Sequence, residues 1–275
     1  MKNRPAILTV YLTVFFACAW SVSTRAQQES QSQFNKQIQK LSYQLDYLQT
    51  YSPLYPTYNA DTMETATDTE EEKMVYLTFD DGPSPRTGEI LDILSAHNIK
   101  ATFFVLKTKD EYIPYMKRAV EEGHTIGVHS ASHKYKEIYR SVDAYLDDFT
   151  KCYNFICDNT GVEPTIFRFP GGSVNNYNKN TCSDIAREMT RRGYIYFDWN
   201  VESNDSKNKI SSNEIYNNVI NGCKGKNRRV IIFHDSISKS STVQALDDII
   251  KTLKSDGWQF AALTNEVRPV VFRMK

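Results

Sequence analysis

The 275-residue sequence has no excess of charge of either sign, because its 33 lysine and arginine residues balance 33 aspartate and glutamate residues. A protein that binds DNA or RNA through phosphate contacts needs a basic surplus or a basic patch, so we expect no nucleic-acid partner. Glycine and proline are also sparse, at 11 and 9 residues, which excludes a collagen-like or wholly disordered chain. A globular enzyme or binding protein remains.

The sequence lacks any Cys-x-x-Cys pair, which argues against a zinc site made of thiolates. Of its five cysteines, Cys18 lies in the apolar N-terminal segment, which leaves Cys152, Cys157, Cys182 and Cys223. An exported protein can form disulfides, and small buried thiols also pack well in a core. Three disulfide pairings and four free thiols therefore all remain open.

One long apolar run is present, at the N-terminus. Ala6–Val22 carries no charge and follows Lys2 and Arg4, a pattern typical of an export signal. We predict that residues 1–26 are a signal peptide or a membrane anchor and that the protein is secreted or held at the cell surface. Both forms remain open, because the cleavage site is poor and the run is slightly shorter than the ~20 residues of a spanning helix.

Residues 27–73 separate the apolar N-terminal segment from the rest of the chain and begin with the polar stretch Gln27–Gln33. Apolar residues at spacings of three and four between Phe34 and Leu48 cover about two heptads, which predicts one short amphipathic helix. Asp61–Glu72 holds six acidic residues and no basic residue, so we expect it to be solvated and flexible. We interpret residues 27–73 as a polar, acidic stalk.

From Met74 onward, apolar strand-like runs alternate with helical patterns. Strands are predicted at Val75–Phe79, Thr102–Val105, Thr125–Val128, Thr165–Phe169, Tyr194–Trp199, Val230–Phe233 and Gln259–Leu263. Helices are predicted at Glu89–His97, Tyr115–Glu122, Val142–Asn159, Ser183–Arg192, Ser212–Ile220 and Val243–Lys254. The alternation predicts an α/β fold of parallel strands with helical crossovers, a distorted (β/α) barrel over residues 74–268. Chemistry in such folds lies at the C-terminal ends of the strands.

Polar residues collect at these strand ends. Asp80 and Asp81 follow the first strand, and the Gly82-Pro83 turn behind them can direct both carboxylates toward one site. His129 and His133 are four residues apart, so we predict that they share one face of a helical turn and bind one cation. Two histidines and one carboxylate with an open position form a known catalytic metal site.

Three more strand-end residues complete this set. Arg168 precedes a Pro-Gly-Gly turn and can orient a carboxylate, Asp205 lies in a polar segment, and His234 directly follows an apolar strand. His97 and His124 have no such placement, and we interpret them as structural. Metal-binding residues together with a base, an acid and an arginine suffice for metal-assisted hydrolysis.

The motifs also carry a family resemblance. In order along the chain they are Thr78–Pro83, His129–His133, Arg168–Gly172, Asp205 and Ile232–His234. Together they resemble the five signatures of the polysaccharide deacetylases, carbohydrate esterase family four. Members of that family have a distorted (β/α) barrel and remove acetyl groups from sugars with a divalent metal.

The resemblance implies a role for each motif residue. Asp81, His129 and His133 would hold the metal, with zinc expected first and cobalt or another divalent ion as alternatives. The catalytic residues would be Asp80 as general base, Arg168 orienting Asp80, His234 as general acid, and Asp205 supporting His234.

Gly171, Ile232 and Trp199 would bind the substrate. The sequence departs from the family pattern at two positions, Gly171 where many relatives have an aromatic residue and Ser206 where they often have tryptophan. Both departures are expected to open the wall of the cleft.

We therefore expect a metal-dependent hydrolase that removes N-acetyl groups from N-acetylglucosamine in an extracellular polysaccharide, with bacterial peptidoglycan as the first choice. The alternatives are chitooligosaccharide, exopolysaccharide, acetylated xylan, a non-sugar amide, or a sugar-binding module whose catalysis has decayed. The presence of both Asp80 and His234 argues against a decayed module, because a binding protein needs neither.

Overall fold

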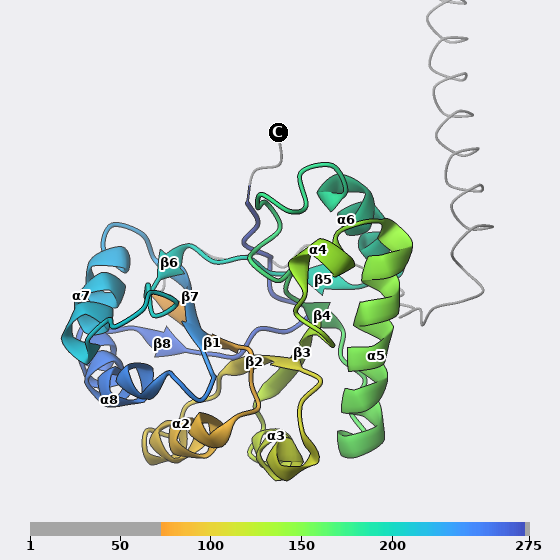
Figure 1. The fold of residues 1–275 in the computed structure, drawn as a ribbon. Helices are drawn as coiled ribbons and strands as arrows, with labels where there is room; N and C mark the ends of the chain where they lie inside the picture. Colours follow the sequence, from red (N-terminus) through yellow and green to blue (C-terminus); the bar gives the residue numbers. More distant parts are fainter. Residues whose placement is uncertain (1–72, 273–275) are drawn as a thin grey trace, which may run out of the picture. The chain divides into compact units, whose positions relative to one another are not determined.

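The computed structural model describes residues 73–272, so the predicted signal or anchor and almost all of the predicted stalk lie outside the described residues. Within this range strands and helices alternate along the chain, as the hydrophobic pattern predicted (Figure 1). None of the helices between residues 73 and 272 combines the length and hydropathy that a membrane span requires.

The described elements are short strands separated by helices of up to 19 residues. The strands are β1 (Met74–Asp80), β2 (Thr102–Leu106), β3 (Thr125–Ser130), β4 (Ile166–Phe167), β5 (Ile195–Tyr196), β6 (Val201–Glu202), β7 (Arg228–His234) and β8 (Gln259–Phe260). The helices are α2 (Pro85–Ala96), the 3-10 turn η1 (Asp110–Tyr112), α3 (Ile113–Glu121), α4 (Tyr135–Ile138), α5 (Val142–Thr160), α6 (Cys182–Arg191), α7 (Ser212–Gly222) and α8 (Ser240–Ser255).

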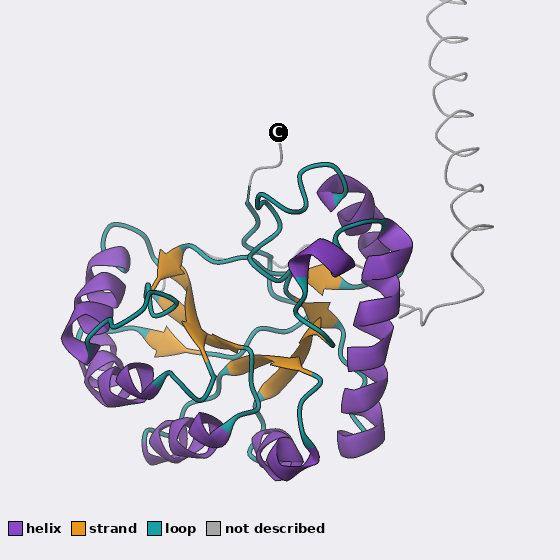
Figure 2. Cartoon of the chain, in the orientation of Figure 1, coloured by secondary structure: helices purple, strands orange, loops and turns teal. Residues whose placement is uncertain are grey.

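The strands form one parallel sheet in the order β5-β4-β3-β2-β1-β7-β6, with β8 pairing to β1. The sheet is curled, and the longer helices cover its convex side (Figure 2). No ladder joins β5 to β6 within residues 73–272, so the curled sheet is an open, distorted barrel. The predicted fold class is confirmed.

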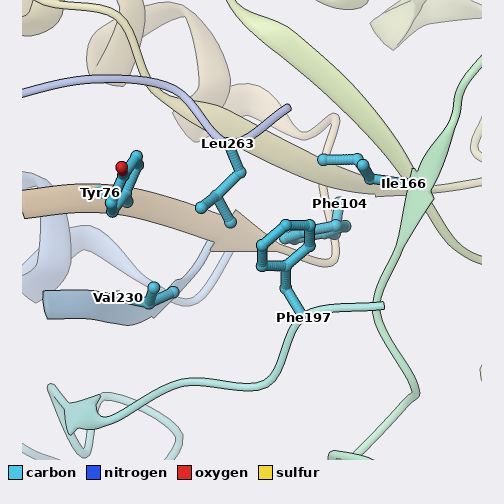
Figure 3. Close-up of a cluster of buried hydrophobic side chains, with 6 residues drawn as sticks. All are labelled: Tyr76, Phe104, Ile166, Phe197, Val230 and Leu263. Atoms are coloured by element: carbon cyan, nitrogen blue, oxygen red, sulfur yellow. The ribbon is translucent and has the colours of Figure 1, made fainter. Parts of the chain in front are cut away.

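Side chains of β1 alternate between the two faces of the sheet. Phe79 stacks on Phe103 and Phe233 of the neighbouring strands, with ring centroids 5.2 and 5.4 Å apart. Tyr76 points to the other face, where it joins a buried cluster with Phe104, Ile166, Phe197, Val230 and Leu263 (Figure 3). This cluster fills the interior of the barrel, and on burial each such side chain contributes about 1.5–3 kcal/mol.

The interior cluster lies directly beneath the polar residues at the C-terminal ends of the strands. Because side chains repeat every two residues, Thr78 and Asp80 lie on the same face as Tyr76, one and two steps nearer the C-terminal end of β1. The register pairs Thr78 with Ile232 and Asp80 with His234 of β7. Alternation and register together therefore place Asp80 and His234 side by side above an apolar core.

Some element boundaries differ from the expected ones. β4 and β5 have two residues each and are shorter than the predicted Thr165–Phe169 and Tyr194–Trp199, although Phe169, Tyr194 and Phe197 near them are buried. α2 begins at Pro85, four residues before its predicted start, since Ser84 and Thr87 form a capping box. α4 and β6 were not predicted.

The four cysteines of the described chain are all free thiols.

Candidate active site

Two adjacent carboxylates enter the site at the end of β1. Asp80 is the last residue of the strand, and Asp81 follows it with a φ of 75°, in the left-handed region that aspartate tolerates better than most residues. This turn breaks the alternation of side chains, so both carboxylates can face one site. A Cβ at Gly82 would lie 2.3 Å from Oδ2 of Asp235, so the turn has no room for a side chain there.

His129 and His133 come together by a route that differs from the prediction. His129 belongs to β3, and His133 follows in an irregular turn with a φ of 54°, so the expected helical turn is wrong. The physical reason is Asp148 of α5, whose carboxylate accepts hydrogen bonds from both amides of residues 131–132 at 2.9 Å. These bonds hold the chain in a turn that brings the two imidazole centroids within 5.3 Å.

Asp81, His129 and His133 present three ligand atoms that all lie within 4.8 Å of one another. Oδ1 of Asp81 is 3.6 Å from Nε2 of His129 and 3.3 Å from Nε2 of His133. That oxygen is buried and has no hydrogen-bond partner within residues 73–272. Burying an unpaired carboxylate oxygen destabilises the fold unless a cation binds there.

The state of His129 also suits a metal ligand. Its Nδ1 lies 2.9 Å from the carbonyl oxygen of Arg168, which places the proton on Nδ1 and leaves a lone pair on Nε2. Burial lowers the pKa of His129 to about 3, so the imidazole is neutral at pH 7. Two imidazole nitrogens and one carboxylate oxygen fit zinc or a similar divalent ion and leave a coordination position for water or substrate.

Arg168 is fully buried behind Asp80. Its Nη1 donates to Oδ1 of Asp80 at 2.9 Å and to Oγ1 of Thr78 at 2.6 Å, and its other nitrogens donate to two backbone carbonyls. Burial raises the pKa of the Asp80 carboxyl, and the charge of Arg168 opposes that rise. One carboxylate oxygen is thus fixed, while Oδ2 lies 3.9 Å from Nε2 of His129, beside the candidate metal ligands.

His234 and Asp205 form a bonded pair across the site. Nδ1 of His234 lies 2.7 Å from Oδ1 of Asp205, whose Oδ2 accepts from the His234 amide at 2.7 Å and from Thr242 at 2.8 Å. Burial lowers the pKa of His234, but the hydrogen bond and charge of Asp205, with the charges of Asp80 and Asp81, raise it to about 9. The imidazole is therefore protonated at pH 7, with Nε2 available to the site.

One pocket of about 230 Å³ connects these groups. The predicted substrate residues Gly171, Ile232 and Trp199 line it, and so do Tyr135 and Glu202, which the sequence did not indicate. The other predicted residues in its lining are Asp80, His129, His133, Asp205 and His234. All ten predicted site residues thus lie in the pocket or directly beside its lining.

Several supporting residues were missed by the sequence reasoning. Besides Asp148, the buried Asp198 accepts hydrogen bonds from the amides of Ser173 at 2.8 Å and Phe272 at 2.6 Å. These partners are backbone amides far along the chain, which no motif or spacing reveals. A usable signal did exist, because Asp198 stands inside an otherwise apolar predicted strand, where a charged residue needs a partner.

Comparison with known proteins gives consistent results. A family model described as polysaccharide deacetylase matches residues 67–193. A peptidoglycan-N-acetylglucosamine deacetylase of Bacillus cereus is 32% identical over 203 residues, covering 72% of this chain and 71% of that protein. A bifunctional xylanase/deacetylase of Pseudobutyrivibrio xylanivorans is 31% identical over 212 residues, covering 76% of this chain and 32% of that protein.

The fold is also similar to solved structures. The catalytic domain of a peptidoglycan N-acetylglucosamine deacetylase from Eubacterium rectale superposes with a TM-score of 0.71 and 36% identity. The match covers 82% of this chain and 99% of that domain. The two proteins are therefore similar in sequence as well as in fold.

Proposed function

The chain belongs to the polysaccharide deacetylase family, and from that premise we propose that it is a metal-dependent N-deacetylase of N-acetylglucosamine in an extracellular polysaccharide, with bacterial peptidoglycan as the substrate. The observation that carries the proposal is the cluster of Asp81, His129 and His133 with a buried, unpaired carboxylate oxygen, flanked by Asp80 and His234.

Asp81, His129 and His133 would hold the ion, for which zinc is our first choice. A divalent ion in this position lowers the pKa of a bound water and polarises the acetyl carbonyl. Two imidazole nitrogens and one carboxylate oxygen suit zinc or a similar transition metal, because magnesium and calcium prefer sites made of oxygen ligands alone.

Asp80 is the general base in this mechanism. Its raised pKa makes it a stronger base than an exposed aspartate, and the bond from Arg168 fixes which oxygen faces the reacting water. Asp80 accepts a proton as the water oxygen bonds to the acetyl carbon. No hydrogen bond within residues 73–272 uses the Gly171 amide, which lies in the pocket lining and can donate to the developing oxyanion.

His234 is the general acid. The carbon–nitrogen bond breaks as the tetrahedral intermediate collapses, and the nitrogen needs a proton because an amide anion is too basic to leave unassisted. A His234 with a pKa near 9 carries that proton at pH 7, and Asp205 holds its ring in position. The products are acetate and a free glucosamine amine. Ile232 and Trp199 would contact the acetylated sugar in the pocket.

We further propose that the protein works outside the cytoplasm. In this arrangement residues 74–268 form the catalytic domain, residues 27–73 the stalk, and residues 1–26 a signal peptide or membrane anchor. The named activity of the peptidoglycan deacetylases to which the chain is similar supports the choice of a cell-wall substrate.

The test is acetate release by the purified full-length chain from peptidoglycan, chitooligosaccharide and acetylated xylan. We expect peptidoglycan to be the best substrate, a chelator to abolish activity, and zinc to restore it. Preference for acetylated xylan would replace the substrate assignment, and activity that resists chelation would overturn the metal assignment.

Two matched variants separate the proposed roles. Asp80→Asn should lower kcat by at least about 10³-fold with bound zinc retained, since the change removes the base and keeps the ligand set. His133→Ala should lose both activity and zinc. Metal content is measured on each purified protein. Loss of zinc from Asp80→Asn would show that Asp80 is a ligand.

A further inference from the structure

Two tyrosines stand together at the edge of the catalytic pocket. Tyr135 is the first residue of α4 and lines the pocket, and Tyr177 lies in the loop after β4. Their ring centroids are 5.2 Å apart at an angle of 44°. Tyr177 is 53% exposed, one of four large apolar side chains of residues 73–272 with such exposure, and Val174 of the same loop is another.

Tyr135 occupies the space that the glycine at position 171 leaves. A Cβ on Gly171 would lie 2.7 Å from Cε1 of Tyr135 and 3.2 Å from its hydroxyl oxygen, so the ring lies against the backbone of this turn. The ring also meets that of His133 edge to face, with centroids 5.1 Å apart. The expectation that Gly171 opens the cleft wall is therefore wrong, because an aromatic ring from α4 closes it.

The loop that carries Tyr177 is held rigidly. Asn178 is fully buried, and its Nδ2 donates to the carbonyls of Gly172 and Ser173 at 3.2 Å. Asn175 donates to the Gly172 carbonyl at 3.0 Å and accepts from the Tyr177 amide at 2.8 Å. These hydrogen bonds preorganise the exposed ring of Tyr177. Less conformational entropy is then lost when a ligand binds to it.

The chemistry of this pair suits a sugar ring. Pyranose C–H groups form an apolar, weakly positive face that packs on the negative face of an aromatic ring, while the tyrosine hydroxyl can bond a sugar hydroxyl. No hydrogen bond within residues 73–272 uses the Tyr135 hydroxyl. Trp199 and Glu202, which are joined by a 3.0 Å hydrogen bond, line the same pocket. Because the ring of Tyr177 packs beside that of Tyr135, a polymer bound in the pocket can extend over both rings.

We propose that Tyr135 and Tyr177 form a subsite that stacks on a pyranose ring of the polysaccharide next to the acetylated sugar, and so select chains over single sugars. This inference rests on the proposed function for its substrate class. Tyr135 and Tyr177 are binding residues here and take no part in proton transfer.

The test measures binding separately from turnover. An N-acetylglucosamine tetramer is titrated by calorimetry into the Asp80→Asn protein, with Tyr135→Ala or Tyr177→Ala added to it. Each added change should raise the Kd about tenfold, the effect of losing one aromatic contact of this kind. Tyr135→Phe in the same protein should restore most of the affinity, since it keeps the ring. Zinc content is measured throughout, because Tyr135 contacts His133.

Tyr216→Ala is the matched control, because Tyr216 is a half-buried tyrosine of α7 outside this pocket and should leave the Kd within twofold. A second test uses the active protein, in which Asp80 is unchanged. There Tyr177→Ala should lower kcat/KM for the tetramer about tenfold relative to kcat/KM for 4-nitrophenyl acetate, and the change should lie in the KM for the tetramer. A Kd within twofold of the parent in both tyrosine variants, or no binding by the parent itself, would overturn the subsite. Tyrosine-dependent binding without any acetate release would uphold the subsite and refute the proposed reaction.

Discussion

At the scale of single residues, the His234–Asp205 pair shows how one hydrogen bond sets a protonation state. Burial by itself would leave His234 neutral at pH 7, and Asp205 reverses that outcome through a 2.7 Å bond and its charge. Asp205 in turn is held ionised by its hydrogen bonds, which outweigh the effect of its own burial and lower its pKa. The proton on His234 is therefore controlled by a residue that need not touch the substrate.

Asp205→Asn should move the alkaline limb of activity to lower pH. The amide keeps much of the shape but removes the Asp205 charge, which together with the charges of Asp80 and Asp81 raises the pKa of His234 to about 9. Since the general acid works only when protonated, activity is lost as pH rises through its pKa, and that loss should begin about one to two pH units earlier. The measurement is kcat/KM for acetate release between pH 6 and 10.

Asp247→Asn is the control for that experiment, because Asp247 forms an Asp–His pair with His97 at 2.7 Å outside the catalytic pocket. Its pH profile should match that of the unchanged protein. An alkaline limb that stays in place in Asp205→Asn would show that another group donates the proton.

At the scale of elements, the turn after β3 that carries the proposed ligand His133 depends on a helix that follows it. Asp148 of α5 accepts three hydrogen bonds, from the Ser130 hydroxyl and from the amides of residues 131–132, and Ser130 in turn accepts from the His133 amide at 2.8 Å. Helix α5 thereby fixes the spacing between the two histidines.

Asp148→Ala should weaken metal binding without removing a ligand. The change leaves two amides of the turn without acceptors, which we expect to lower zinc affinity about 10–100-fold and the free energy of unfolding by about 2–3 kcal/mol. Zinc affinity is measured by competition with a chelator, and stability by urea unfolding of the zinc-free protein. Asp158→Ala changes an exposed aspartate of the same helix, far from the turn, and should alter neither quantity by much. Equal zinc affinities in the two variants would contradict this role.

The sequence predicted the long elements and the strand-end residues better than it predicted how those residues are held. β1, β2, β3 and β7 have the largely apolar runs that burial on both faces requires, and the ends of β1, β3 and β7 carry predicted polar groups. α4 has four residues, too few to show a hydrophobic period. The turn between His129 and His133 could not be foreseen from its own residues, because its conformation depends on Asp148, 15 positions beyond His133.

At the scale of the whole molecule, the C-terminal segment covers the region between the two edges of the sheet. The Asp198 amide donates to the Val270 carbonyl at 2.7 Å, and Phe272 packs edge to face on Trp199 with centroids 4.9 Å apart. Asp198 also supplies a carbonyl to Arg168. The tail therefore supports both a wall of the pocket and the arginine behind Asp80.

Phe272→Ala should lower both stability and activity. Losing the contact with Trp199 and Gly172 should cost about 2 kcal/mol, which corresponds to a Tm about 4–8 °C lower for a domain of this size. kcat/KM for polysaccharide should fall as well, because Trp199 loses its support. Val271→Ala, at a side chain that is 47% exposed, is the adjacent control and should change the Tm by about 1 °C or less. Thermal unfolding and acetate release check both variants, and equal effects would refute the supporting role.

The position of β1 in the sheet has a consequence for the order in which the protein is made. β1, which carries Asp80, pairs with β7 and β8. The register partner of Asp80 is His234, which is synthesised 154 residues after Asp80. At 5–20 residues per second, roughly 8–30 s pass between the two. A growing chain therefore holds the proposed general base long before the proposed general acid, and the proposed reaction can begin only when synthesis of the domain is nearly complete.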